Sequence, residues 1–181
     1  MRRTRHDNTA PIILSCDPSF TAWGFVVMQD RRVRLAGCIK TEPSAKKLRI
    51  RKGDDRVRRA SEIIHVLMQV IKENEVVFIV SELPHGSQNA SAAVMIGLVI
   101  GILQTLSMTL DIPVEWYSED DGKKAVTGRK GPSKQDIIDA VDKIYGVNWQ
   151  NIKYKDEAVA DALAIYHAAS LNSPTLKFIN R

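Results

Sequence analysis

The chain has 181 residues, of which 44% are hydrophobic and 26% are charged, and its formal net charge is +5. This composition is typical of a folded domain and excludes a disordered chain, and the length is too short for two full hydrophobic cores. The basic balance favours a polyanionic partner such as nucleic acid, although many proteins with other functions are equally basic.

The sequence contains no signal for secretion or for a membrane span. The basic segment 1–10 does not lead into the apolar core of a secretory signal, and the longest apolar stretch, residues 92–103, is too short to cross a bilayer. Cys16 and Cys38 lie in apolar, strand-like segments, which favours small core residues over a disulfide or metal pair. We therefore expect a protein of the cytoplasm, the nucleoid or an organellar matrix that is not secreted and has no membrane partner.

Apolar patterns along the chain predict three strands followed by alternating helices and strands. The predicted strands are residues 12–16, 23–28, 33–39, 76–81 and 113–117. A first helix begins in the basic stretch 41–59 and ends at Asn74. The later helices are expected at residues 89–109, 120–126, 133–144 and 156–171.

This order of elements predicts an α/β fold in which helices cover a mixed sheet. We expect a basic extension at residues 1–10, one folded domain at 11–172 and a tail at 173–181. Gly97 and Gly101 lie four residues apart on the long apolar helix, so another helix can pack closely against it. That helix is either a core helix or an interface with a second subunit.

Acidic residues follow two apolar strands and occur on the last helix. Asp17 follows the first strand and Glu82 the fourth, where each strand leaves the core. Glu157 and Asp161 are four residues apart and share one helix face, while Asp156 lies further round. Acids near a helix N-terminus can simply face water. A carboxylate at the end of a buried strand, however, needs a partner, and a divalent cation is suitable.

These acids, together with several short motifs, resemble the RuvC family of Holliday junction resolvases in the ribonuclease-H-like nuclease superfamily. The motifs are Asp17-Pro18-Ser19, Thr21-Ala22-Trp23-Gly24, Ser81-Glu82, Lys123-Lys124-Ala125-Val126-Thr127-Gly128 with Lys134, and Ala160-Asp161-Ala162-Leu163-Ala164. The resemblance spans residues 12–168. It implies a ribonuclease-H-like fold, with a mixed five-stranded sheet whose first three strands are antiparallel and which is flanked by helices.

The resemblance also implies a homodimer that cuts four-way DNA junctions symmetrically with Mg²⁺, which Mn²⁺ can replace, and without a small-molecule cofactor. Asp17, Glu82 and Asp161 match the family's metal ligands by position. The fourth ligand of the family lies three residues before the last Asp, where this chain has Ala158. Glu157 is the first candidate for that role, and Asp156 is held in reserve.

A two-metal mechanism assigns a task to each of these acids. By analogy, Asp17 bridges the two ions and Glu82 holds the ion on the leaving-group side. Asp161 and Glu157 then hold the ion that activates the attacking water. Oxygen ligands favour Mg²⁺ or Mn²⁺ over zinc.

Two groups of basic residues are candidates for DNA contact. The first lies beside the predicted active site and includes two lysines, Lys123 and Lys134, that match family lysines; its members are Lys123, Lys124, Arg129, Lys130 and Lys134. The second could hold a junction arm or simply be solvated, and consists of Lys46, Lys47, Arg49, Arg51, Lys52, Arg56, Arg58 and Arg59. His85 stands where the family has an aromatic wedge, so it either contacts the DNA or faces solvent.

Two other functions remain open at this point. One is a ribonuclease-H-like nuclease that acts on RNA or on another branched DNA. The other is a junction-binding module that does not cleave, which the missing acid at Ala158 keeps in view. The source of the chain also remains open, because a bacterial, phage or organellar protein would have the same motifs.

Overall fold

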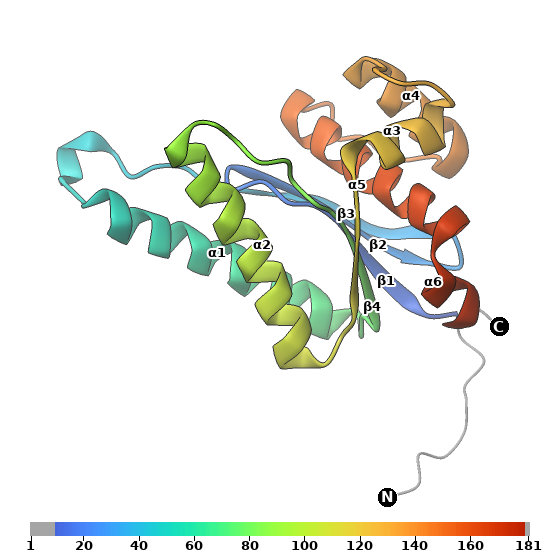
Figure 1. Cartoon of the computed structure of the whole chain (residues 1–181), viewed down its shortest axis with the longest axis horizontal. Helices are drawn as coiled ribbons and strands as arrows, with labels where there is room; N and C mark the ends of the chain where they lie inside the picture. The colour runs from blue at the N-terminus through green and yellow to red at the C-terminus, as the bar shows by residue number, and fades with distance from the viewer. Residues whose placement is uncertain (1–9, 180–181) are drawn as a thin grey trace, which may run out of the picture.

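The computed structural model describes residues 10–179. Almost all of the predicted basic extension, residues 1–10, therefore lies outside the described residues. A mixed five-stranded sheet runs through the middle of the molecule in the order β3-β2-β1-β4-β5 (Figure 1). The strands are β1 (Ile12–Asp17), β2 (Ala22–Gln29), β3 (Arg32–Lys40), β4 (Phe78–Glu82) and β5 (Val114–Tyr117).

The direction of each strand agrees with the predicted fold class. The first three strands form an antiparallel meander, because β2 is antiparallel to both β1 and β3. β4 then pairs with β1 in parallel, and β5 pairs with β4 in parallel. The predicted mixed sheet, with its antiparallel start and five strands, is confirmed.

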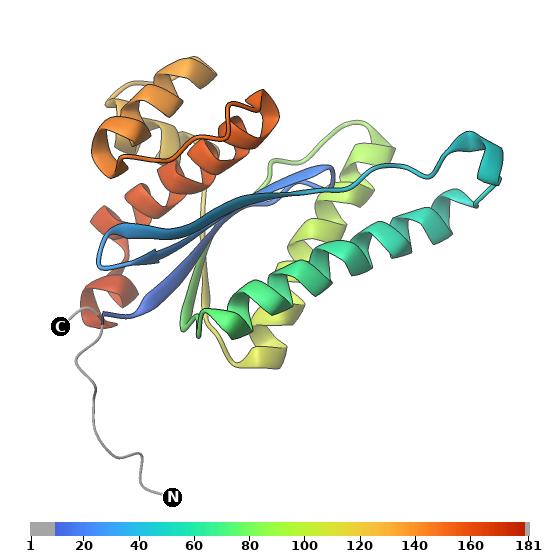
Figure 2. The ribbon, with the colours of Figure 1, turned by 180° about the vertical axis from the view of Figure 1, so that it is seen from behind.

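Helices cover both faces of the sheet and form two separate cores (Figures 1 and 2). One face is covered by α1 (Lys52–Glu73) and α2 (Ala90–Leu110). The other face is covered by α3 (Glu119–Thr127), α4 (Lys134–Tyr145), α5 (Lys153–Asn172) and the short α6 (Pro174–Ile179). A short 3₁₀ helix, η1 (Lys46–Leu48), precedes α1 and lies at one end of the molecule.

Alternation along β1 directs its side chains to the two cores in turn. Leu14 and Cys16 are buried in the core beneath α1 and α2, whereas Ile13 is buried in the core beneath α5. Successive strand residues point to opposite faces of a sheet. Ser15 therefore faces α5, where its hydroxyl donates a 2.7 Å hydrogen bond to the Ala162 carbonyl oxygen.

The helix boundaries differ from the predicted ones by a few residues, because local caps set them. Ser118 and Ser133 form capping boxes at the first turns of α3 and α4. Within the predicted tail 173–181, residues 174–179 form α6, and Leu176 is only 2% exposed. The buried Ser173 accepts a hydrogen bond from the Leu176 backbone N–H and so caps that helix.

α2 is apolar throughout and only partly covered. It has 21 residues, none of them charged, and only 28% of the residues in its most apolar 18-residue stretch are buried. By length and composition, α2 could cross a membrane. The prediction that the longest apolar stretch is too short to cross a bilayer was therefore wrong, because the helix extends beyond residues 92–103. One such helix is weak evidence for a membrane span, because helices in cores and subunit interfaces have the same composition.

Gly24 of β2 lies against the backbone of α5. A Cβ atom at this position would lie 2.1 Å from the carbonyl oxygen of Ala158 and 2.9 Å from its Cβ atom. Gly24 is also the pairing partner of Asp17 in the β1–β2 register. The missing side chain thus allows α5 to approach the sheet beside Asp17.

We expect Gly24→Ala to destabilise the fold by about 1–3 kcal/mol, because the new methyl group forces α5 away from β2. The free energy of unfolding, measured with urea, tests this. Gly53→Ala is the matched control, since a Cβ at Gly53 in α1 meets nothing within 4 Å. Equal effects of the two substitutions would contradict the close approach of α5 to β2.

Candidate active site

Asp17 and Glu82 lie beside each other at one edge of the sheet. Asp17 ends β1 and Glu82 ends β4, and the parallel register pairs Cys16 with Ser81 just before them. Neighbouring strands are about 4.8 Å apart. By alternation both acids belong to the face that α5 covers, as do Ile13 and Phe78 further back along their strands. The strand ends therefore bring together the two acids predicted from the sequence.

Asp161 approaches the same edge from α5. Two contacts hold that helix against the sheet: the close approach of Ala158 to Gly24, and the hydrogen bond from Ser15 to the Ala162 carbonyl, one residue after Asp161. The Asp161 side chain is 13% exposed. Three of the four predicted metal ligands thus converge although they lie far apart in the sequence.

The pKa values of all three acids are raised, chiefly by burial. Burial, followed by the charges of Glu82 and Asp161, raises the pKa of Asp17 well above its usual value. Burial and the charges of Glu119 and Asp161 raise the pKa of Glu82 to about 7. Burial also raises the pKa of Asp161, although Lys134 opposes this. Partly buried carboxylates with too little positive charge nearby are typical of a cation site.

Two lysines supply positive charge at the site. Lys134, the first residue of α4, forms an ion pair with Asp161, and Lys123 of α3 forms one with Glu119. The charges of both lysines also oppose part of the rise in the pKa of Glu82. The two lysines that match family lysines therefore both lie at the acidic site.

Glu119 is the residue that the sequence analysis missed. It is the first residue of α3 and follows Tyr117, the pairing partner of Glu82, by two positions. A hydrogen bond from Lys123 lowers the pKa of Glu119, and the charge of His85 contributes. Its position two residues after the last apolar strand was the feature of the sequence that could have indicated a site residue. It was overlooked because Asp17 and Glu82 end their strands directly.

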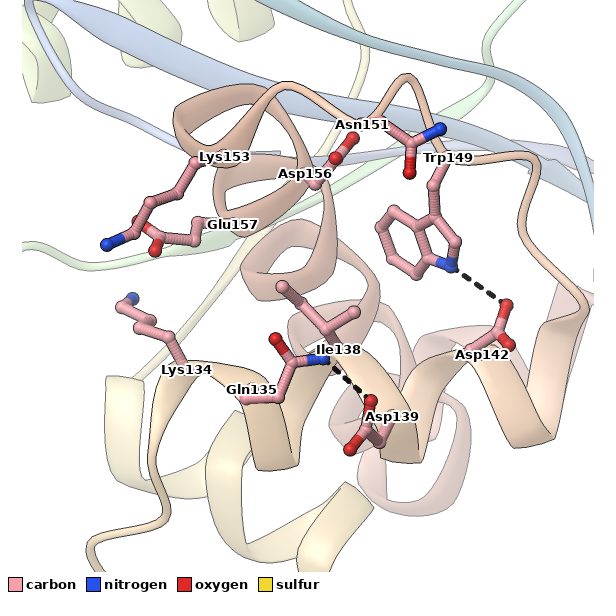
Figure 3. A pocket seen from close by; sticks show the side chains of 10 residues that line it. All are labelled: Lys134, Gln135, Ile138, Asp139, Asp142, Trp149, Asn151, Lys153, Asp156 and Glu157. Carbon is pink, nitrogen blue, oxygen red and sulfur yellow. Dashed lines mark hydrogen bonds between the residues drawn. The ribbon is translucent and has the colours of Figure 1, made fainter.

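Asp156 and Glu157 lie near the start of α5 and line a cavity that adjoins the site, because Lys134, the partner of Asp161, lines it too. Asp156 accepts a 3.1 Å hydrogen bond from the Gln150 backbone N–H, which ties down the loop before α5. Glu157 lines a cavity of about 630 Å³ together with Lys134, Lys153 and Trp149 (Figure 3). Neither acid is among the main charges that shift the pKa values of Asp17, Glu82 and Asp161. A metal-binding role for Glu157 stays a prediction.

The predicted DNA contacts near the site lie around α3 and α4. Lys124, Arg129 and Lys130 are exposed there, and Arg129 pairs with Asp136 at 2.6 Å. His85 is exposed in the loop after β4, near enough to Glu119 to lower its pKa. The loops that surround the carboxylates therefore present basic side chains to solvent.

The second basic group divides into exposed and buried members. Arg49, Arg51 and Arg56 are exposed or half-buried around η1 and the start of α1, and Arg56 donates a 3.0 Å hydrogen bond to Ser91 at the start of α2. Arg59 is only 8% exposed, because its guanidinium stacks on Phe20 with 4.5 Å to the ring centroid. The prediction that Arg59 belongs to the DNA-facing group was therefore wrong.

Arg59 instead fixes the turn that follows Asp17. Its guanidinium donates hydrogen bonds to the Thr41 hydroxyl at 2.9 Å and to the Phe20 carbonyl at 3.1 Å. Burial lowers the pKa of Arg59, although an arginine stays protonated. This buried cation links α1 to the β1–β2 turn and to the end of β3.

The carboxylate set fits a hard divalent cation by its chemistry. Within residues 10–179, no three His, Cys, Asp or Glu side chains are grouped to hold an ion as they stand. Lysine ammonium groups occupy part of that space, since Lys134 bonds Asp161 and Lys123 bonds Glu119. The donors are oxygen atoms with a surplus of negative charge, which Mg²⁺ and Mn²⁺ prefer.

Comparison with known sequences identifies a family. The family model described as "Crossover junction endodeoxyribonuclease RuvC" matches residues 13–167. The enzyme of that description from Chlamydia felis is 26% identical over 159 residues, which cover 87% of this chain and 92% of the relative. The one from Chlorobium phaeobacteroides is 28% identical over 158 residues, with coverages of 85% and 78%.

Solved structures confirm the fold. T. thermophilus RuvC in complex with a Holliday junction substrate matches with a TM-score of 0.69 and 19% identity, over 89% of this chain and 96% of that chain. The yeast mitochondrial Holliday junction resolvase Ydc2 matches with a TM-score of 0.65 and 9% identity, over 93% and 81%. The predicted resemblance and the predicted enzyme class are confirmed: the chain belongs to the RuvC family of crossover junction endodeoxyribonucleases, which are metal-dependent nucleases.

Proposed function

We propose that the protein resolves four-way DNA junctions by symmetric hydrolysis of phosphodiester bonds, that Mg²⁺ is its metal, and that it acts as a homodimer in the cytoplasm or on the nucleoid. The observation that carries this proposal is the convergence of Asp17, Glu82 and Asp161 in a chain that matches the family over residues 13–167. The T. thermophilus relative was solved with a Holliday junction substrate, so a four-way junction is the first substrate to test.

The acids and lysines of the site have distinct tasks in this proposal. Asp17, Glu82 and Asp161 would hold Mg²⁺ or Mn²⁺, whose positive charge would offset the negative charges of Glu82 and Asp161 that act on Asp17. Bound divalent ions activate water and stabilise the leaving oxygen in phosphodiester hydrolysis. Lys123 and Lys134 would orient the phosphate, while Lys124, Arg129 and Lys130 contact the adjacent backbone.

We expect Asp17→Asn to reduce cleavage of a labelled four-way junction by about 10²-fold or more, because loss of a metal contact removes several kcal/mol of transition-state stabilisation. The measurement compares Mg²⁺, Mn²⁺ and EDTA. Asp120→Asn, which removes an exposed acid of α3, is the matched control.

Cleavage products identify the function. Paired nicks at symmetric positions of the junction, with linear duplex left intact, support the proposal. Preferential cutting of RNA–DNA hybrids would indicate a ribonuclease-H-like activity instead. Binding of the junction without any cutting would indicate a non-cleaving module.

The metal-free site should weaken the fold as the pH rises. Glu82 has a pKa of about 7 in the folded protein, above the ordinary value of 4.5. As the pH increases, the unfolded chain therefore releases this proton first, and stability falls until the pH passes the folded pKa. Glu82→Gln should therefore raise the free energy of unfolding, measured with urea in EDTA. We expect this increase to be about 2–3 kcal/mol larger at pH 8 than at pH 4.5.

Glu75→Gln is the control for this experiment, because Glu75 is exposed and precedes β4 at its opposite end. Its effect should change by less than about 0.5 kcal/mol between the two pH values. If Glu82→Gln changed the free energy of unfolding equally at pH 4.5 and pH 8, the Glu82 carboxylate would be well solvated. That result would contradict a raised pKa of Glu82 in the metal-free site.

The partly covered face of α2 supports the homodimer. An apolar groove of about 350 Å³ lies between α1 and α2, and a Cβ atom at Gly97 or Gly101 would meet nothing within 4 Å. The groove is lined by Ala60, Ile64, Gly97, Leu98, Gly101, Ile102, Thr105 and Leu106. Glycines four residues apart permit close packing of a partner helix, and a second copy of α2 has the matching apolar surface.

We expect the wild-type protein to be a dimer by size-exclusion chromatography with light scattering. Gly97→Leu combined with Gly101→Leu should raise the dimer dissociation constant at least about tenfold, since the new side chains fill the groove. Gly53→Leu, another helical glycine with open space around it, should leave the dimer intact. A monomeric wild-type protein would contradict the dimer.

A further inference from the structure

Glu119 follows the end of the third parallel strand, and acids end the other two. β1, β4 and β5 are neighbours in the sheet and run in the same direction. Asp17 and Glu82 end the first two, and the register pairs Glu82 with Tyr117, the last residue of β5. Glu119 follows two residues later, so the chain reaches the same edge of the sheet a third time with an acid.

The packing of α3 turns Glu119 toward α5. Gly122 of α3 lies against α5, where a Cβ atom would be 3.0 Å from the Ile165 Cδ1 atom and 3.3 Å from the Ala164 carbonyl carbon. Glu119 precedes Gly122 by three residues, so the two lie on the same face of α3. On α5, Asp161 precedes Ile165 by one turn. The contact between the two helices therefore brings the acids of α3 and α5 toward the same edge of the sheet.

The charges at the site agree with this placement. Among the charged groups that act on Glu82, Glu119 has the largest effect on its pKa, ahead of Asp161. Glu119 also acts on Asp17 and Asp161. Its own partner is Lys123, which forms an ion pair with it across one turn of α3. Glu119 and Asp161 are thus each paired with a lysine, Glu119 within α3 and Asp161 with a lysine of α4.

The position of the acid that is missing from α5 lies on the β2 side of Asp17, whereas Glu119 lies on the β5 side of Glu82. Ala158 is 5% exposed and packs against Gly24, the pairing partner of Asp17. Glu157, one residue earlier, lines the cavity between α4 and the start of α5, which Lys134, the partner of Asp161, also lines. The site therefore lacks a carboxylate on α5 at position 158 and has an additional one on α3.

We propose that Glu119 is the fourth carboxylate of the metal site, supplied by α3 in a chain that has alanine at position 158. Lys123 holds its side chain in the metal-free protein. This inference rests on the proposed metal-dependent function, and it names a ligand from a different element of the fold.

The test is a calorimetric titration of the full chain with Mn²⁺ in the absence of DNA. Glu119→Gln keeps the size of the side chain and removes only its charge. Asp120→Asn removes one charge from the same helix turn and is the matched control, and Glu157→Gln tests the competing candidate. We expect Glu119→Gln to weaken Mn²⁺ binding about tenfold or more. The other two variants should stay within about twofold, and melting in EDTA verifies that every variant folds.

Each outcome separates the inference from the proposed function through the Asp17→Asn variant. If Asp17→Asn weakens Mn²⁺ binding but Glu119→Gln does not, the metal site stands and Glu119 is not its ligand. An effect of Glu157→Gln as large as that of Glu119→Gln also overturns the inference. If the wild-type protein binds no Mn²⁺, or Asp17→Asn binds it normally, the metal-dependent function fails as well.

Discussion

The site depends on carboxylates that the backbone forces together. Parallel pairing of β1 with β4 is fixed by buried apolar pairs such as Leu14 and Ile79, both with no exposed surface. That register places Asp17 beside Glu82 whether or not their charges are neutralised. Burial raises the pKa values of Asp17 and Glu82, and nearby carboxylates add to the rise: Glu82 acts on Asp17, and Glu119 acts on Glu82. The stability of the core therefore maintains a charge arrangement that would not form by itself.

The second constraint is the distance between α5 and the sheet. α5 must come very close to β2 for Asp161 to lie near the acids at the strand ends. Gly24, which has no side chain, leaves space for the Ala158 backbone. The buried hydrogen bond from Ser15 to Ala162 then fixes the helix along its axis. Gly24 is the pairing partner of Asp17 in the β1–β2 ladder. Ser15 precedes Asp17 by two residues, and Ala162 follows Asp161 directly. Packing and active-site geometry thus depend on the same few atoms.

Much of this was predictable, because strands and helices have distinct periods. Asp17 and Glu82 were found from the sequence since each directly follows a short apolar run, and Asp161 was found from the motif around it. Glu119 was not found, because its position depends on the β4–β5 register and on the contact of Gly122 with α5, which are non-local. Arg59 was misplaced for a similar reason: in a run of basic residues, only tertiary packing distinguishes the one that is buried.

The two faces of the sheet separate the two parts of the proposed function. Along β1, Ile13, Ser15 and Asp17 belong to the face that α5 covers, whereas Leu14 and Cys16 belong to the core beneath α1 and α2. The acidic site is built on the first face, and the apolar groove of α2 lies beyond the second. Because a strand directs successive residues to opposite sides, six residues of β1 support both surfaces without sharing a side chain between them. A substitution in the α2 groove can therefore alter assembly and leave the carboxylates in place, which is why assembly and cleavage can be tested independently.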